Sequence, residues 1–353
     1  MLDDVADLRA AVARGGVIIV AGAGVTAAAT CGAPAATWIG LLESGISHVQ
    51  EVAHDLPHGW EAAVRQEQEL AANGYMPSVT GLADKVLDAL GGRAGPAFAE
   101  WLRAQVGGLE LRSRDLVDAI VGLGAPIATT NYDGLFEDAT GRHYATWRQT
   151  SHAQMALQGQ SEDIVHLHGH WREPESIVLD GFSYGALSAH APAQALERAV
   201  GTVRTLLFVG CGDGVYDPHF GALRGWLKDT FRTEAKHYRL CLDGELDALR
   251  TEHRDERIVP IAYGATHSDL VSFLRALGSV RKTGHGLTAV AAPERVRSAL
   301  RAGAHRHRPR RPPARRGHPA AGHSPRAPGA PAHEPRAVRR GPEPREGPAP
   351  EAL

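Results

Sequence analysis

Cysteine is scarce in this chain of 353 residues, which contains only Cys31, Cys211 and Cys241. The three cysteines lie far apart and form no C-x-x-C pair, so the sequence offers neither a disulfide framework nor a cysteine-based zinc site. Long hydrophobic runs are also missing, since no stretch approaches the ~20 apolar residues that span a bilayer. The start of the chain is acidic, whereas a signal peptide begins with basic residues. We therefore expect a cytoplasmic protein without membrane contact.

Aromatic residues are absent after Phe273, and 12 of the 22 prolines lie after residue 304. Residues 292–353 hold 14 Arg and 5 Glu, whereas the rest of the chain is net acidic. Such a segment buries too little apolar surface to offset the entropy of ordering it. We predict a domain over residues 1–283 and a disordered, low-complexity basic tail over residues 284–353. Because base stacking needs aromatic side chains, we do not expect this tail to bind nucleic acid.

The domain is expected to have an α/β fold with a Rossmann-like doubly wound parallel sheet, because apolar β-branched runs alternate with segments of helical length. A helical layer is expected as an insertion over residues 40–110, with helices at 59–72, 78–90 and 96–106. Two further helices are predicted at 111–123 and 219–230, and a short one at 293–302. The predicted strands are Gly16–Val20, Pro126–Thr129, Asp163–Leu167, Thr205–Val209, Tyr238–Leu242 and Ile258–Ile261.

Glycine-rich or polar segments directly follow four of these strands. Gly22-Ala23-Gly24 follows the first, and such glycines let the backbone approach a pyrophosphate at the N-terminus of the next helix. Thr26 is predicted to cap that helix and to bond a phosphate. Without the full G-x-G-x-x-G spacing, a tight turn that binds no ligand is an equal alternative. Phe208–Gly214 repeats the pattern, with Asp213 as a ribose ligand or a turn former.

Thr129-Thr130-Asn131-Tyr132-Asp133 follows another strand, where side chains point into the ligand crevice of a doubly wound sheet. Asn131 could hold a ribose hydroxyl or a water, and Asp133 could bind a sugar. A simpler alternative is that either residue caps the helix that begins near Gly134.

Three histidines lie at the end of a further strand, in His166-Leu167-His168-Gly169-His170. Period-two spacing predicts that all three share one face of the strand. Histidine suits general base catalysis near neutral pH. The alternatives are buried structural histidines and a zinc site, for which Cys211, Asp213 or Asp217 could supply a third ligand although nothing in the spacing requires it. We therefore expect no metal.

Taken together, these segments resemble the SIR2 superfamily, and specifically its bacterial SIR2-like branch of NAD hydrolases. The resemblance rests on Gly22–Thr26, Thr130–Asp133, His168-Gly169 and Val209–Asp213, in this order along the chain. It extends over roughly residues 10–280. The sirtuin four-cysteine zinc module is absent from this sequence, so zinc is not expected, and NAD is the substrate that the resemblance implies.

The resemblance also implies roles for individual residues. Asn131 and His168 would be catalytic, with Asp133 shaping the same pocket. The NAD-binding residues would be Gly22, Ala23, Gly24 and Thr26 at the pyrophosphate, Thr130 beside Asn131, Gly210, Gly212 and Asp213 at the adenosine half, and Tyr263 and Gly264 near the adenine.

The reaction implied is hydrolysis of the nicotinamide–ribose bond to nicotinamide and ADP-ribose, or to a cyclised product, in defence against phage. Two alternatives stay open: an NAD-dependent protein deacylase, and a nucleotide-binding sensor without turnover. A second copy of the chain and a defence-system protein are the protein partners implied.

Overall fold

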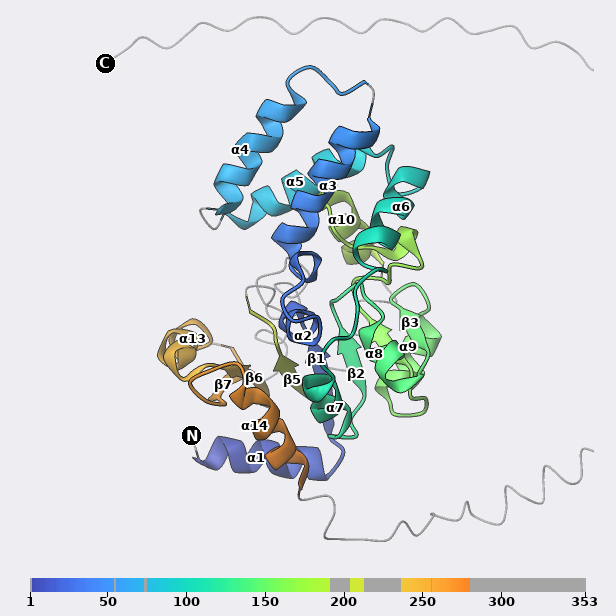
Figure 1. The fold of residues 1–353 in the computed structure, drawn as a ribbon. Coiled ribbons are helices and arrows are strands. Elements are labelled where there is room, and N and C mark those ends of the chain that lie inside the picture. Colours follow the sequence, from blue (N-terminus) through green and yellow to red (C-terminus); the bar gives the residue numbers. More distant parts are fainter. Residues whose placement is uncertain are drawn as a thin grey trace, which may run out of the picture. The chain divides into compact units, whose positions relative to one another are not determined.

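The computed structural model describes residues 2–53, 55–72, 75–190, 204–212, 236–254 and 256–279. Seven strands form one sheet in the order β3-β4-β2-β1-β5-β6-β7, and every neighbouring pair is parallel (Figure 1). The strands are β1 (Val17–Ala21), β2 (Ile127–Thr129), β3 (Tyr144–Thr146), β4 (Ile164–His166), β5 (Thr205–Val209), β6 (His237–Cys241) and β7 (Ile258–Ala262). The α/β fold with a parallel sheet is thereby confirmed.

The direction of winding reverses beside β1. The chain first adds β2, β3 and β4 on one side of β1, and then returns to add β5, β6 and β7 on the other side. The loops that follow β1 and β5, the two neighbouring strands at this reversal, both lie at the carboxyl edge of the sheet. In open parallel sheets, this reversal point is where ligands bind.

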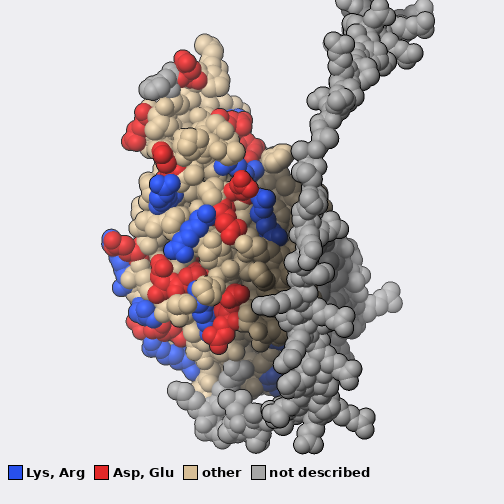
Figure 2. Space-filling model, turned by 90° about the vertical axis from the view of Figure 1, so that its right-hand side faces the viewer, with Lys and Arg blue, Asp and Glu red and all other residues tan. Residues whose placement is uncertain are grey.

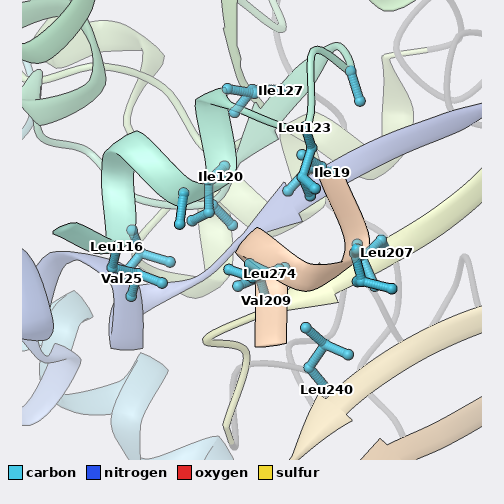
Figure 3. Close-up of a cluster of buried hydrophobic side chains, with 14 of the residues drawn as sticks. Ile19, Val25, Leu116, Ile120, Leu123, Ile127, Leu207, Val209, Leu240 and Leu274 are labelled. Atoms are coloured by element: carbon cyan, nitrogen blue, oxygen red, sulfur yellow. The ribbon is translucent and has the colours of Figure 1, made fainter. Parts of the chain in front are cut away.

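All five residues of β1 are buried, which explains its unbroken apolar sequence. Ile19 packs on one face of the sheet, in a core cluster shared with helices α1, α2, α7, α8 and α14. Figure 3 shows side chains of this cluster, among them Ile19 and Leu207 from neighbouring strands and Ile120 of α7. Ile18 packs on the opposite face with residues of α9. Both faces of the central strand are therefore covered, as in a doubly wound fold.

Helices surround the sheet and extend beyond it. They are α1 (Leu2–Ala13), α2 (Ala23–Ala29), α3 (Trp38–Val52), α4 (Trp60–Ala72), α5 (Met76–Ala89), α6 (Pro96–Gln105), α7 (Asp115–Val121), α8 (Leu135–Thr140), α9 (Thr150–Leu157), α10 (Gly181–Ala189), α13 (Leu246–Glu252) and α14 (Asp269–Gly278), with short 3-10 turns at Pro34–Ala36, Pro174–Ser176 and Asp243–Glu245. Helix α7 starts later than the predicted residue 111, because the N–H groups of Arg112 and Ser113 donate to the carbonyl of Ala29.

Helices α3 to α6 form a helical region with a core of its own, lying off the sheet in Figure 1. Gly45 of α3 lets this region pack closely, since a Cβ there would lie 2.8 Å from Val86 and 3.0 Å from Trp101. The indole N–H of Trp101 donates to Ser44 Oγ at 3.0 Å. The predicted helical layer is thus present, and it begins at Trp38.

The predicted tail over residues 284–353 lies outside the described residues, as do the helices predicted at 219–230 and 293–302. Among the helices that the structure describes, none has the length and apolar character needed to cross a membrane. Acidic and basic side chains are intermixed on the face shown in Figure 2. The described part of that face therefore presents no continuous basic track of the kind that follows a nucleic-acid backbone.

Candidate functional site

A cavity of about 760 Å³ opens at the carboxyl edge of the sheet, a volume within the usual range for small-molecule sites. The helical region lines its other side through Ile39, Leu41, Val79 and other residues. Most predicted site residues line it: Gly22, Ala23, Gly24, Thr26, Thr130, Asn131, Asp133, His168, Gly210, Gly212 and Tyr263. Of the remaining two, Gly264 does not line the cavity, and Asp213 lies outside the described residues.

The glycines after β1 and β5 touch one another. A Cβ on Gly22 would lie 2.7 Å from the carbonyl oxygen of Gly210, and a Cβ on Gly24 would lie 2.9 Å from the same atom. Gly210 has a φ of +64°, and a Cβ there would lie 2.8 Å from the backbone nitrogen of Val25. The N–H of Gly22 donates to the carbonyl of Val209 at 3.0 Å, and that of Gly24 to the carbonyl of Gly210 at 2.9 Å. These glycines bring two loops together, and their N–H groups are used in doing so.

Thr26, Asn131 and Asp133 form a buried hydrogen-bonded chain. The side-chain amide of Asn131 donates to the carbonyl of Gly22 at 3.0 Å and to Thr26 Oγ1 at 2.8 Å. Thr26 Oγ1 in turn donates to Asp133 Oδ2 at 2.5 Å. The prediction that Thr26 caps α2 is therefore wrong: Gly22 is the N-cap, and Thr26 lies inside the helix with its hydroxyl turned to Asp133.

The two polar side chains from the β2 loop differ in what they can offer a ligand. Asp133 uses both carboxylate oxygens, because Oδ1 also accepts from the N–H of Leu135 at the start of α8. Burial raises the pKa of Asp133, against the opposing effect of its bonds from Thr26 and Leu135. Asn131 donates its amide protons to Gly22 and Thr26, but within the described residues its Oδ1 accepts no hydrogen bond. Asn131 Oδ1 is thus an acceptor that no described residue occupies, on a side chain that lines the cavity.

The three histidines do not share a face, contrary to the prediction. Strand β4 ends at His166, and Gly169 then turns the chain with a φ of +90°. A Cβ on Gly169 would lie 2.2 Å from the carbonyl oxygen of Ser176, so only glycine fits this turn. His168 lines the cavity, whereas the rings of His166 and His170 meet each other with centroids 4.7 Å apart.

The cavity, its glycine loops and its Asn and His side chains lie where the winding reverses. Residues 126–261 match the family model of the SIR2-like domain. This chain contains a SIR2-like domain. The SIR2-like match begins just before β2 and ends in β7, and it is consistent with the binding or processing of NAD.

Within the SIR2-like match lie the predicted residues Thr130, Asn131, Asp133, His168, Gly210, Gly212 and Asp213. The glycines after β1 lie outside it, as do Tyr263 and Gly264. Gly264 has a φ of +149°, and a Cβ there would lie 2.5 Å from the Cβ of Asp269. The fold therefore requires this glycine for packing against α14.

Two side chains that line the cavity were missed by sequence reasoning. Trp38 lines the cavity, and its indole N–H donates to the hydroxyl of Tyr132 at 3.0 Å. That hydroxyl donates to the carbonyl of Val178 at 2.7 Å. Arg239 lines the cavity from within β6, and its guanidinium donates to the carbonyl of Gly212 at 3.0 Å. Neither residue stands in a recognisable motif, because their partners lie far away along the chain.

Cys211 also lines the cavity, but its thiol is unsuited to nucleophilic catalysis. Sγ contacts the carbonyls of Val20 and Val209 at 3.4 and 3.6 Å. Burial raises the pKa of the Cys211 thiol to about 12, so the thiolate is scarcely populated at neutral pH.

Behind the cavity wall, the SIR2-like domain brings together Glu137, His166 and His170, whose ligand-type atoms lie within 4.8 Å of one another. Such a group could hold a metal ion. However, the N–H of Arg172 donates to His170 Nδ1 at 3.2 Å. Burial lowers the pKa of His170 to about 2, so its ring is neutral and its one proton sits on Nε2. A cation at Nε2 would displace this proton to Nδ1 and break the bond from Arg172. The absence of zinc nevertheless stays a prediction.

Proposed function

We propose that this chain hydrolyses the nicotinamide–ribose bond of NAD, giving nicotinamide and ADP-ribose. The observation that carries the proposal is the convergence of Asn131 and His168 with four glycines on one cavity, at the reversal point of a sheet that includes the SIR2-like match. Reversal points bind nucleotides in folds of this kind.

For hydrolysis of the nicotinamide–ribose bond, the main task of the protein is to position the NAD and the attacking water. Nicotinamide is a cationic leaving group, so the C1′–N bond breaks with its electron pair returning to the ring nitrogen, leaving an oxocarbenium-like ribose. A water then forms the C1′–O bond and gives up a proton. In the proposal Asn131 Oδ1 orients that water, and His168 accepts the proton directly or by relay.

The remaining proposed contacts follow the layout of the loops. Gly22, Ala23, Gly24 and Thr130 would lie along the pyrophosphate and the nicotinamide ribose, and Gly210, Gly212, Asp213 and Tyr263 along the adenosine half. The glycines after β1 contribute by leaving room, because the N–H groups of Gly22 and Gly24 are already bonded. We further propose that the activity serves phage defence by depleting NAD, on the strength of the family resemblance.

The test is incubation of the purified full-length chain with NAD, with the products separated by chromatography and identified by mass. We expect nicotinamide and ADP-ribose. His168→Ala should lower the rate about 10²- to 10⁴-fold, the usual contribution of a general base, and Asn131→Ala should also lower it. His152→Ala, on the exposed surface of α9, is the matched control.

Each alternative has its own outcome in this assay. Deacetylation of an acetyl-lysine peptide with formation of O-acetyl-ADP-ribose would replace the proposal by a protein deacylase. A cyclised ADP-ribose would mean that the adenine, rather than water, captures the ribose. Stabilisation of the fold by NAD with no product in any assay, including those with cell extract added, would indicate a sensor.

A further inference from the structure

Glu137 and His166 form a buried pair directly behind Asn131. His166 is 0% exposed and Glu137 is 7% exposed. His166 Nε2 lies 2.9 Å from Glu137 Oε1, and His166 Nδ1 lies 2.9 Å from the main-chain carbonyl oxygen of Asn131. The pair thus links α8 and β4 to Asn131, which lines the cavity.

The chemistry of these contacts fixes where one proton sits. The carbonyl oxygen of Asn131 can only accept, so His166 Nδ1 must carry a hydrogen. His166 Nε2 faces the Glu137 carboxylate, and a hydrogen bond between the two requires a second proton, which they share. Burial alone would lower the pKa of His166, but the bond and charge of Glu137, the Asn131 carbonyl and nearby Asp133 together raise it. The contacts of His166 with the Asn131 carbonyl and with Glu137 therefore favour the doubly protonated ring over the neutral one.

We propose that Glu137 and His166 are positioning residues for Asn131, with the Nδ1–H of His166 fixing the Asn131 carbonyl and Glu137 fixing the imidazole. The inference rests on the proposed function for its kinetic consequence. Asn131 is then anchored at two points: its carbonyl by His166, and its side-chain amide by Gly22 and Thr26. With both anchors in place, Oδ1 has one direction in which to point.

Two amide substitutions of the same ring separate this role from simple core filling. In His166→Asn the amide nitrogen takes the place of Nδ1 and can still donate to the Asn131 carbonyl. In His166→Gln the amide nitrogen reaches towards the place of Nε2 and leaves that carbonyl without its donor. Both are made together with Glu137→Gln, so that no unpaired carboxylate is left buried in either variant.

The kinetic readout is kcat and KM for NAD, compared with Glu137→Gln alone. We expect kcat of the His166→Asn double variant within about threefold of that reference, and kcat of the His166→Gln double variant lower by about 10- to 100-fold. KM should change by about twofold or less in both. Equal losses, or a smaller loss with the bulkier Gln, would mean that His166 only fills space.

Crystal structures of the two double variants test the positioning without any turnover. Asn131 should keep its contacts with Gly22 and Thr26 in the His166→Asn variant and lose them in the His166→Gln variant. An unmoved Asn131 in both variants overturns the inference, while an inactive wild type with these shifts overturns only the proposed function.

If neither variant folds, histidine ¹⁵N NMR of the wild-type chain decides. The inference requires Nδ1 of His166 to be protonated and coupled to the Asn131 carbonyl, and it fails if Nδ1 is bare. Metal analysis of the purified chain adds a further check. A stoichiometric bound metal that Glu137→Gln removes would make these residues ligands and would also refute the inference.

Discussion

Replacing Thr26 by valine removes one oxygen from the centre of the site with almost no change in shape. Two hydrogen bonds are lost: the one that Thr26 donates to Asp133 at 2.5 Å and the one that it accepts from Asn131 at 2.8 Å. A bond to a charged group contributes about 1.5–3 kcal/mol and a neutral one about 0.5–1.5 kcal/mol. Thr26→Val should therefore lower the free energy of unfolding by about 2–4 kcal/mol, and Thr26→Ser should largely preserve it.

The decrease in the free energy of unfolding caused by Thr26→Val should also depend on pH. The bond from Thr26 lowers the pKa of Asp133, against the burial that raises it. Without that bond the folded-state pKa rises further above the unfolded value. A carboxyl with a raised pKa contributes stability at low pH that is lost as the pH rises through the folded pKa. The deficit of Thr26→Val relative to wild type should therefore be larger at pH 8 than at pH 5.

Urea unfolding followed by circular dichroism at both pH values measures this deficit. Thr26→Ser is the matched control, since it keeps the hydroxyl and loses only a methyl group. The reasoning fails if Val and Ser behave alike, or if the deficit of the Val variant is the same at pH 5 and pH 8.

Two further predictions concern the free energy of unfolding, one at two glycines and one at a buried histidine. Gly210→Ala should destabilise the chain by about 2–4 kcal/mol in the same urea assay, because a positive φ and a contact of 2.8 Å to the Val25 nitrogen both disfavour a Cβ. Gly185 is exposed within α10, and no described atom lies within 4 Å of a Cβ placed there. Gly185→Ala should therefore raise the free energy of unfolding by about 0.5–1 kcal/mol. A change of the same sign in both glycine variants would contradict this reasoning. His237 accepts a hydrogen bond from the N–H of Leu206, and burial and then Arg257 lower its pKa to about 4. Its contribution is present above pH 6.5 and lost towards pH 4, up to about 3 kcal/mol. His237→Asn, which keeps an acceptor, should flatten stability over this range, and an unchanged acid profile would contradict the assignment.

The strands with apolar runs were predictable from the sequence, and all six of those expected are present. Strand β3 was not, because Tyr144-Ala145-Thr146 is a three-residue edge strand whose sequence carries no distinctive pattern. Its existence depends on pairing with β4, a contact that no local signal encodes.

The candidate site was predictable where it follows strand ends and unpredictable where it depends on distant partners. Asn131 and His168 follow strands, so the topology brings them to the cavity edge. The side chain of Glu137 turns inward from α8 to meet His166, 29 residues away, and no spacing rule foresees that pair. The period-two expectation for the histidines failed because β4 ends at His166, and Gly169 redirects the chain.

The contact between the glycine loops has an evolutionary consequence. Gly22 and Gly24 exclude a Cβ because of the backbone of Gly210, and Gly210 excludes one because of the backbone of Gly24 and Val25, although the two loops lie far apart in the sequence. Replacing one of these glycines by a larger residue requires the partner loop to move away. That movement would break the two hydrogen bonds between the loops, from Gly22 to Val209 and from Gly24 to Gly210. In related chains these three glycines should therefore be inherited, or lost, as a set.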